Sequence, residues 1–425
     1  MSLPKHTSFK PAVAPWIREI PSHWVEKPFY ALARERKVKN KGMQEDNLLS
    51  LSYGEIVRKD INTPTGLLPE SFETYQIVEP DDVIFRLTDL QNDKRSLRSA
   101  ICSERGIITS AYLAVQFEDI LPAFMNYLMR AYDVQKVFYT MGGGLRQSLG
   151  FEDLRRMSIV APSLDEQISI VNFLDRETAR IDGLIEKKGR FIELLNDKEK
   201  AAISRFVRLG VDPRATLAES GVAWRGKVPA HWTRGRMKNH FRQVKRQGFE
   251  ALTVLSVYRE YGVIEKGSRT DNINKTPEDL SKYQLVEPKD LAINKMKAWQ
   301  GSMGVSGLRG ITSPDYVVMQ PIGEHNPRYM HHYLRARPMP WVYRLISNGI
   351  RTDQWRLEPE KFLELPIFLP PMDEQQEIAD RIDRELEHIR ALIAKTQRSI
   401  ELLKEKRSTL ITAAVTGKID IRSAA

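Results

Sequence analysis

Three short motifs occur twice in this chain, always the same distance apart. The segment WIREIPSHW at Trp16–Trp24 returns as WRGKVPAHW at Trp224–Trp232. PSLDEQ at Pro162–Gln167 returns as PPMDEQ at Pro370–Gln375, and YQIVEP returns as YQLVEP, each with an offset of 208 residues. Solenoid units recur at about 20–50 residues, so this long period predicts a duplicated domain together with its connector. A chain with two similar domains suits a target with two similar halves.

Length and composition exclude several classes of protein. A chain of 425 residues is too long for one core, and a content of 41% hydrophobic and 28% charged residues is typical of a globular rather than a membrane protein. The sequence shows no apolar run of about 18 residues and no signal-peptide layout at its start. Cys102 is the only cysteine, and the histidines show no metal-ligand spacing, so we expect a cytoplasmic protein without a metal site.

The net charge of +10 is concentrated in a few segments. Trp224–Arg246 contains eight Lys and Arg residues and no acid, and Lys27–Lys41 contains six against Glu35. Asn326–Arg356 contains six Arg residues against Asp353, interleaved with aromatic residues. Such clusters are typical of a protein that binds a polyanion, most often nucleic acid. A solvated basic surface is the alternative, and the duplication favours nucleic acid.

Each repeat begins with about 150 residues of mixed character. Short β-branched or aromatic runs bounded by Pro, Gly and Asp predict strands. They are Leu48–Tyr53, Asp81–Phe85, Gly106–Phe117 and Met157–Pro162 in the first repeat, and Ala251–Tyr258, Lys289–Asn294, Gly310–Gln320 and Leu365–Pro370 in the second. A helical stretch at Pro122–Met141 is matched by Asn326–Ile346. The predicted fold class is therefore α+β.

Each repeat ends with a long amphipathic segment. Apolar or neutral residues recur every three or four positions from Leu164 to Leu195 and from Met372 to Leu410, which predicts two helices with apolar stripes. A helix of about 40 residues is about 60 Å long and would leave its stripe wet alone, so we expect an antiparallel pair. The predicted domains are residues 1–161 and 224–369, the helices 162–209 and 370–415, the linker 210–223 and a fraying tail 416–425.

No constellation of catalytic residues emerges from the sequence. The glycines of Gly142–Leu149 are not followed by Lys-Ser/Thr, and neither G-x-S-x-G nor H-E-x-x-H occurs. EPDD at Glu79–Asp82 resembles the acidic start of a nuclease site, but its partner EPKD at Glu287–Asp290 has one acid fewer. A turn that enters a strand explains both copies, so we predict no catalytic residue in this chain.

Two pairs of loops have the composition of DNA-contacting segments. Phe85–Arg98 and Ile293–Ser302 are rich in residues that hydrogen-bond bases and phosphates, and they differ between repeats while the flanking EP turns agree. Ordinary drift of surface loops is the alternative. Gly142–Leu154 and Ser347–Phe362 share a Gly, an aliphatic residue and an Arg that could donate to guanine or phosphate, or instead cap the preceding helix.

These loops and the adjoining strands give the predicted DNA-contacting residues. In the first repeat they are Arg86, Thr88, Gln91, Asn92, Lys94, Arg95, Thr109, Ser110, Tyr112, Arg146 and Gln147. In the second repeat they are Asn294, Lys295, Lys297, Trp299, Gln300, Thr312, Ser313, Arg351, Thr352 and Gln354.

The order of these motifs resembles the specificity subunit of Type I restriction–modification enzymes over essentially the whole chain. The most specific features are PSLDEQ and PPMDEQ, each at the start of a long helix, and the IPSHW and VPAHW segments. The resemblance implies two target recognition domains that each read one half of a split DNA site, with the paired helices setting the distance. The two loops after Arg146 and Arg351 diverge, which leaves the transfer of base contacts there open.

The same resemblance implies partners and cofactors outside this chain. Two modification subunits, which bind S-adenosylmethionine and methylate adenine, would dock on the helices. Restriction subunits, which use ATP and Mg²⁺, would complete a nuclease. The chain itself would bind double-stranded DNA, contain no cofactor and have no membrane partner. The alternatives are a nuclease or methyltransferase with its own catalytic centre, or a coiled-coil scaffold that does not bind DNA.

Overall fold

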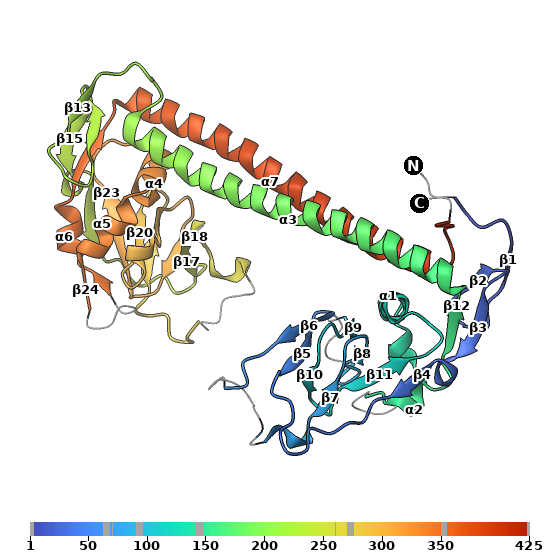
Figure 1. The fold of residues 1–425 in the computed structure, drawn as a ribbon. Helices are drawn as coiled ribbons and strands as arrows, with labels where there is room; N and C mark the ends of the chain where they lie inside the picture. The colour runs from blue at the N-terminus through green and yellow to red at the C-terminus, as the bar shows by residue number, and fades with distance from the viewer. Residues whose placement is uncertain are drawn as a thin grey trace. The chain divides into compact units, whose positions relative to one another are not determined.

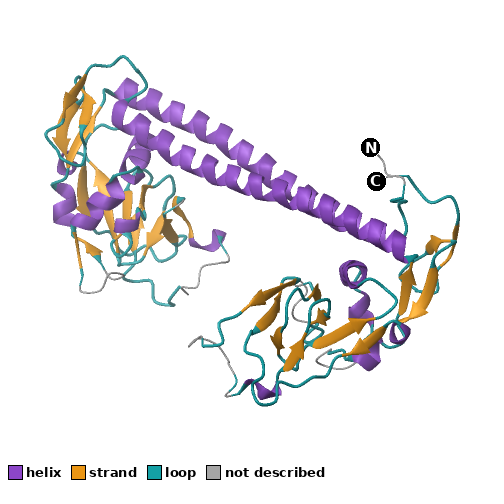
Figure 2. Cartoon of the chain, in the orientation of Figure 1, coloured by secondary structure: helices purple, strands orange, loops and turns teal. Residues whose placement is uncertain are grey.

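The computed structural model describes residues 4–62, 69, 71–90, 97–141, 148–259, 261–269, 276–349 and 355–422. The chain divides into two compact units, unit 1 formed by Met1–Lys188 with Arg398–Ala425, and unit 2 formed by Gly189–Gln397. Each unit holds one globular domain of mixed strands and short helices and a part of each long helix, as Figures 1 and 2 show. The α+β prediction is confirmed.

Unit 1 contains twelve of the described strands. They are β1 (Phe9–Pro11), β2 (Glu19–Pro21), β3 (Val25–Pro28), β4 (Ala33–Glu35), β5 (Leu49–Ser52), β6 (Glu55–Arg58), β7 (Gln76–Val78), β8 (Val83–Phe85), β9 (Ser99–Ile101), β10 (Gly106–Ile108), β11 (Leu113–Phe117) and β12 (Ser158–Ala161). Its helices are α1 (Pro122–Val134), α2 (Phe151–Leu154) and the first part of α3 (Leu164–Leu209).

Unit 2 repeats this order. Its strands are β13 (Leu217–Glu219), β14 (Lys227–Pro229), β15 (Thr233–Arg236), β16 (Phe241–Val244), β17 (Leu255–Tyr258), β18 (Gly262–Glu265), β19 (Gln284–Val286), β20 (Leu291–Asn294), β21 (Met303–Val305), β22 (Gly310–Thr312), β23 (Tyr316–Pro321), β24 (Ser347–Asn348), β25 (Arg356–Leu357) and β26 (Pro366–Leu369). Its helices are α4 (Pro327–Arg335), α5 (Met339–Leu345), α6 (Pro359–Leu363) and most of α7 (Met372–Val415).

The two domains have the same sheet topology. A four-stranded antiparallel sheet has the order β4-β11-β8-β9 in unit 1 and β16-β23-β20-β21 in unit 2. The two-stranded sheets also correspond, with β7-β10 matching β19-β22, β5-β6 matching β17-β18 and β3-β12 matching β15-β26. Helix α1 packs against β9, and α4 packs against β21. The predicted strands at Gly106–Phe117 and Gly310–Gln320 are each two strands that belong to different sheets.

The second predicted helical stretch, Asn326–Ile346, is interrupted. Helix α4 ends at Arg335 and α5 begins at Met339. Pro338 lies between them and has no backbone N–H, so it cannot continue the hydrogen-bond ladder of α4. The first stretch likewise ends early, at Val134, and a short 3₁₀ turn covers Val137–Thr140.

The long helices run antiparallel in each unit, as predicted. In unit 2, Arg390 of α7 pairs with Glu199 of α3 at 3.0 Å, and Arg381 stacks on Phe206. In unit 1, Arg407 of α7 pairs with Asp182 of α3 at 3.0 Å. Positions rise along α3 as they fall along α7, which defines the antiparallel direction.

The apolar stripe is buried chiefly where each helix meets its domain. Leu174 and its counterpart 208 residues later, Ile382, are both buried, with 0% and 1% of their surface exposed. Leu174 belongs to the core of unit 1 and Ile382 to that of unit 2. The first turns are different, because Leu164 and Met372 are exposed although the periodicity assigned them to the stripe.

The C-terminal tail packs against the domain of unit 1 instead of fraying. Ile421 is only 3% exposed and belongs to the core that contains Trp24. The backbone N–H of Asp420 donates to the carbonyl of Pro4 at 2.8 Å. The prediction of a frayed tail is therefore wrong for residues 416–422, because an apolar residue in that segment has a core to enter.

Candidate nucleic-acid interface

The two most similar repeated motifs contact each other in the fold. In unit 1, Glu166 in the first turn of α3 accepts a hydrogen bond from Trp24 Nε1 at 3.1 Å and pairs with His23 Nε2 at 3.0 Å. The corresponding distances in unit 2 are 3.3 Å and 2.7 Å, between the side chains of Trp232, His231 and Glu374. A carboxylate in the first helical turn is also favoured by the helix dipole. These residues therefore join each long helix to its domain.

The glutamine that follows makes a second duplicated connection. Gln167 Oε1 accepts from the backbone N–H of Leu121 at 2.7 Å, and its Nε2 donates to the carbonyl of Pro162 at 2.9 Å. The same two bonds, at 2.8 Å and 3.0 Å, are made in unit 2 by Gln375 with Asn326 and Pro370. Buried amides require partners at both ends. The repeated DEQ motif thus fixes the start of α1 or α4 against the long helix.

The acidic EP turns have a structural role. Asp82 is 1% exposed, its Oδ2 accepts from the backbone N–H of Glu79 at 2.9 Å, and the same oxygen forms an ion pair with Arg36, 2.5 Å from Nε. Asp290 repeats this arrangement with Glu287 and Arg246. Burial raises the pKa of both carboxyl groups, and the hydrogen bonds oppose that shift. These carboxylates are enclosed by their own turn, which agrees with a turn that enters β8 or β20 and not with a nuclease centre.

Much of the local basic charge is compensated by acids from elsewhere in the fold. Within the acid-free segment Trp224–Arg246, Arg236 and Lys238 both pair with Glu364. Arg225 is 2% exposed and donates to the carbonyl of Val207. The sequence therefore overestimated the positive surface of this segment, because it counted charges along the chain and not in space.

The first predicted loop of unit 2 carries an aromatic and basic cluster. Trp299 and Trp355 lie with ring centroids 5.6 Å apart, and the guanidinium of Arg344 lies 4.4 Å from the Trp355 ring. Trp299 Nε1 donates to the carbonyl of Met296 at 3.1 Å, which fixes the ring. Lys297 beside it is exposed. We call Lys297, Trp299, Arg344 and Trp355 the aromatic–basic cluster; aromatic faces with adjacent cations suit stacking on bases and contact with phosphates.

The remaining predicted residues of this loop lie close to the cluster. Asn294 ends β20, and its Oδ1 accepts from the backbone N–H of Met296 at 3.1 Å. The carbonyl of Lys295 accepts from Leu357 N, which connects the loop to β25. Gln300 is half-buried in the 3₁₀ turn Ala298–Gln300.

In unit 1 the corresponding loop is described at its ends only. Arg86 is half-buried, and its backbone N–H donates to the carbonyl of Arg98 at 2.9 Å. The carbonyl of Thr88 accepts from Arg98 Nη1 at 3.1 Å. Arg98, which is buried, thus ties the two ends of the loop together. The predicted contacts in between lie outside the described residues, and they are Gln91, Asn92, Lys94 and Arg95.

The predicted strand-end residues differ in exposure. Ser110 is exposed, and Thr109 is half-buried with its Oγ1 accepting from Ala111 N at 3.3 Å. Tyr112 packs against the small cluster that contains Ile84 and Cys102. In unit 2, Ser313 Oγ accepts from Asp315 N, again at 3.3 Å. Thr312 is 1% exposed and donates to the carbonyl of Leu255, so its side chain is not at the surface.

The second pair of loops is described in part. The Arg of each Gly-x-Arg motif lies outside the described residues, and so do all the predicted contacts of this pair, which are Arg146, Gln147, Arg351, Thr352 and Gln354. The loops are bounded by described elements, with α2 following the first and β24 and β25 flanking the second. The predicted DNA contacts of this pair stay predictions.

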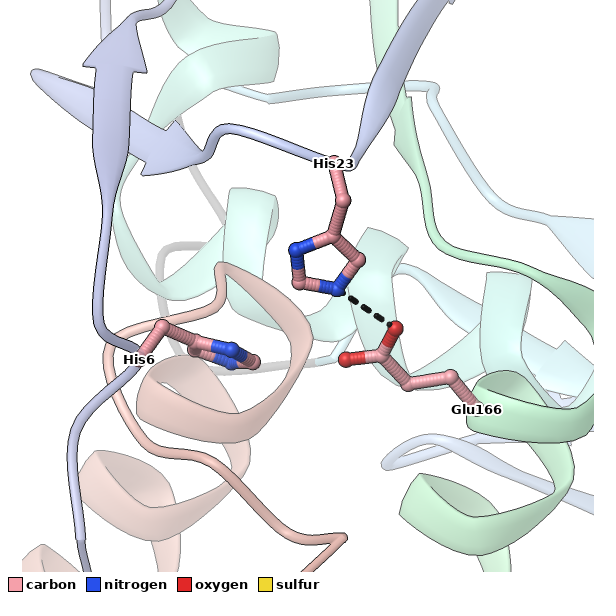
Figure 3. A group of neighbouring side chains, drawn as sticks. All are labelled: His6, His23 and Glu166. Carbon is pink, nitrogen blue, oxygen red and sulfur yellow. Dashed lines mark hydrogen bonds and ion pairs between the residues drawn. The ribbon is translucent and has the colours of Figure 1, made fainter.

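One group of side chains was missed because its members are far apart in sequence. His6, His23 and Glu166 converge so that one ligand atom from each lies within 4.8 Å of the others (Figure 3). Residue spacing could not find this group, although the co-occurrence of IPSHW and DEQ in both repeats was a signal that His23 and Glu166 meet. Among the described helices, none combines the length and the apolar character that crossing a membrane requires.

The second half of the chain matches a family model. Residues 251–402 match the Type I restriction modification DNA specificity domain. The putative type I restriction enzyme MjaX specificity subunit of Methanocaldococcus jannaschii is 22% identical over 311 residues, which cover 72% of this chain and 69% of the relative. The MjaVIII specificity subunit of the same organism is 25% identical over 297 residues, and this alignment spans 64% of each chain, less than two thirds of that relative.

Two solved structures share the fold. One is a chain from a structure that describes complex assembly and conformational transition of the type I R-M system. It has a TM-score of 0.66 at 15% identity, and the match covers 94% of this chain and 99% of that one. The HsdS subunit of Thermoanaerobacter tengcongensis has a TM-score of 0.54 at 16% identity, covering 94% and 98%. Such subunits are DNA-recognition components and not catalytic ones, and a nuclease or methyltransferase is not favoured. Together these findings confirm the resemblance of this chain to the specificity subunits of Type I restriction–modification enzymes.

Proposed function

We propose that this chain recognises a bipartite DNA site, with the α+β domain of each unit reading one half. The observation that carries the proposal is a duplicated scaffold with unlike loops. The Glu, Gln and Asp connections are the same in both units. The loop after β8 and the loop after β20 differ in sequence, while the turns before them agree. Identical frames with different contact loops are expected if each domain reads different bases.

The aromatic–basic cluster is the proposed contact surface of unit 2. Its Trp rings and its Lys and Arg side chains come from the loop after β20, from α5 and from the strand region at β25. In this role Lys297 and Arg344 contact phosphates, and Trp299 stacks on or packs against a base or sugar. The loop after β8, with its Arg, Lys, Gln and Asn residues, has the same role in unit 1.

The partners that we propose are two modification subunits and, in a complete nuclease, restriction subunits. The paired helices α3 and α7 offer the modification subunits a surface shared by both repeats, since exposed Leu194 and Leu402 lie on them outside the buried stripe. S-adenosylmethionine, ATP and Mg²⁺ would be bound by those partners and not by this chain. Because the target is cellular DNA, we propose a cytoplasmic location.

DNA binding tests the proposal directly. The full chain, copurified with its modification subunits, should bind duplex DNA with an affinity that falls steeply with salt, because each phosphate contact adds close to one unit of log–log slope. Mapping of methylated adenines in a host that expresses the complex should give one split sequence with two defined halves. Binding that is insensitive to salt, or methylation without a split site, would contradict the proposal.

The alternative function is an enzyme that carries its own centre, and the chain purified without partners separates the two. We expect neither S-adenosylmethionine binding by equilibrium dialysis nor cleavage of plasmid DNA with Mg²⁺. Either activity, retained after removal of copurifying proteins, would establish the alternative.

A further inference from the structure

The two units differ at the junction between a long helix and the start of a domain. In unit 2, residues 210–216 lead by continuous chain from the end of α3 into β13. In unit 1, the tail after α7 and the segment before β1 meet as separate chain ends, joined by the bond from Asp420 N to Pro4 O. These two segments are distant along the chain and are held together here by non-covalent contacts.

A group of potential metal ligands lies at this junction in unit 1. His6 comes from the N-terminal segment, His23 from the turn between β2 and β3, and Glu166 from the first turn of α3. Figure 3 shows the two imidazole rings and the carboxylate facing one another, with the ribbon of the C-terminal segment passing beside His6. The set of two imidazoles and one carboxylate is one that Zn²⁺ commonly uses.

His6 is the residue whose position the fold leaves unexplained. Its side chain is 2% exposed, and neither ring nitrogen has a hydrogen-bond partner among the described residues. The closest acid, Asp420, lies 3.6 Å from Nδ1, which is too long for a hydrogen bond. A buried polar group without a partner is costly, so an unseen partner for this ring is expected.

Unit 2 provides the matched comparison. It has the same His–Glu pair in His231 and Glu374, at 2.7 Å, so the pair alone is a connection within the fold. The position that corresponds to His6 with the offset of 208 is Arg214, which is exposed and cannot serve as a metal ligand. The third ligand therefore occurs in unit 1 and has no counterpart in unit 2.

We propose that His6, His23 and Glu166 bind one Zn²⁺ ion, which fastens the N-terminal segment of unit 1 to the start of α3. Zn²⁺ bonds of about 2.0–2.2 Å place tetrahedral ligands about 3.3 Å apart. The His23–Glu166 distance of 3.0 Å is close to this value, and the three ligand atoms all lie within 4.8 Å of one another. Binding would therefore need a movement of His6 of no more than about 1.5 Å.

The surroundings would orient the ligands, and a water molecule would complete the four ligands that Zn²⁺ prefers. Trp24 Nε1 already donates to Glu166 Oε1 and orients the carboxylate. Asp420 can complete the outer shell by accepting a hydrogen bond from the His6 ring, as carboxylates do for metal-bound imidazoles. Asp420 also forms an ion pair with Arg422. A hydrogen bond from His6 to Asp420 would therefore connect the metal site to the segment that follows α7.

The test uses the full chain, made without a histidine tag, stripped with EDTA and dialysed. Zn²⁺ is added at a small excess, unbound metal is removed, and the Zn content per chain is measured by mass spectrometry. The variants are His6→Asn, which removes the third ligand, and His231→Ala, which breaks the equivalent pair in unit 2. The proposal predicts about one Zn²⁺ per chain for the unaltered protein and for His231→Ala, and loss of the ion in His6→Asn.

Two further measurements, of melting temperature and of visible absorption, test the same proposal. Zn²⁺ should raise the melting temperature of the unaltered chain and leave that of His6→Asn unchanged, since only a ligand of the folded state stabilises it. Co²⁺ in place of Zn²⁺ should give the visible absorption of a tetrahedral site in the unaltered chain, whatever happens to the variants. A chain that retains no Zn²⁺, or a His6→Asn variant that retains as much as the unaltered chain, would overturn the proposal.

Discussion

Unit 1 and unit 2 are two versions of one domain that differ in how they are closed. In both, the same Glu and Gln residues at the start of a long helix fix the domain to that helix. In unit 2 the neighbouring segment follows directly on α3, whereas in unit 1 two segments distant along the chain, near Pro4 and near Asp420, meet at this place. The comparison shows which contacts the fold requires, since those are present twice, and which are particular to one copy.

The differences lie in the loops and in individual buried residues. The connection between α1 and the long helix uses Tyr127 with Asp175 at 2.6 Å in unit 1, and the matching contact in unit 2 uses His332 with Asp383 at 3.3 Å. The carboxylate is retained and its partner has changed. Conserved geometry with altered chemistry makes the two units internal controls for each other.

The largest expected effect is on the buried stripe of the long helices. Leu174→Ala in unit 1 and Ile382→Ala in unit 2 should each destabilise the unit concerned by about 3 kcal/mol, because both side chains are fully packed. Urea unfolding followed by hydrogen exchange in each unit measures the loss. Ile168→Ala, at a position that is 48% exposed, is the control and should cost less than about 1 kcal/mol. Equal losses at all three positions would show that the stripe is not the packing face.

The duplicated glutamine should give the next largest effect. Gln167→Ala and Gln375→Ala each remove a side chain that satisfies two backbone groups, and each should cost about 2 kcal/mol. Thermal unfolding of both variants checks the value. A large loss in one unit with none in the other would break the equivalence of the two scaffolds.

Acid should distinguish the units through His331, the fifth residue of α4, since the fifth residue of the corresponding helix α1 is Asn126. Burial lowers the pKa of His331 to about 3 from 6.5, so the folded state favours the neutral ring. The contribution of the neutral ring to the free energy of unfolding is complete above pH 6.5 and is lost progressively as the pH falls towards 3. At pH 5 the free energy of unfolding is lower by about 2 kcal/mol for this reason.

The matched variant is His331→Asn, which introduces the residue of unit 1. Its stability should vary less between pH 7 and pH 5 than that of the unaltered chain. Guanidinium unfolding at the two pH values measures this difference. An unchanged pH dependence would mean that His331 does not bind a proton on unfolding in this range.

The smallest expected effect is that of Lys297 on DNA affinity. Lys297→Ala should weaken binding of all sequences by a similar amount, below about 1 kcal/mol, and lower the salt slope by about one, as loss of one phosphate contact does. Trp299→Ala should cost about 1–3 kcal/mol through loss of stacking. Fluorescence anisotropy at several salt concentrations distinguishes these effects. Lys418→Ala, at an exposed position outside the basic segments and the predicted loops, is the basic-to-neutral control.

Most of the architecture could be predicted from the sequence because it depends on periodicity and duplication. The 208-residue offset predicted two α+β domains, and the three/four spacing that begins at Leu164 and Met372 predicted both long helices. The interruption at Pro338 was missed because apolar periodicity continues through it. The exposure of Leu164 and Met372 was missed because periodicity defines a face of the helix and not how far a neighbour covers it.

The candidate site was less predictable, because it depends on contacts between distant residues. The pairing of Arg236 and Lys238 with Glu364 lowers the local positive charge of a segment that contains no acid of its own. The burial of Thr312 follows from its place in β22, which the strand prediction implied but did not orient. The meeting of His6 with Glu166 joins residues 160 positions apart, and local spacing gives no signal for it.

The central claim is that each α+β domain reads its own half-site, and replacing one domain by the other tests it most directly. In the exchange variant, residues 224–369 are replaced by a second copy of residues 16–161, which is the corresponding segment at the offset of 208. The variant is expressed with the modification subunits, and its methylated sites are mapped in genomic DNA. The account predicts a split site whose two halves contain the same bases, with the half read by unit 1 unchanged. A site identical to that of the unaltered chain, or a change in the half assigned to unit 1, would contradict it.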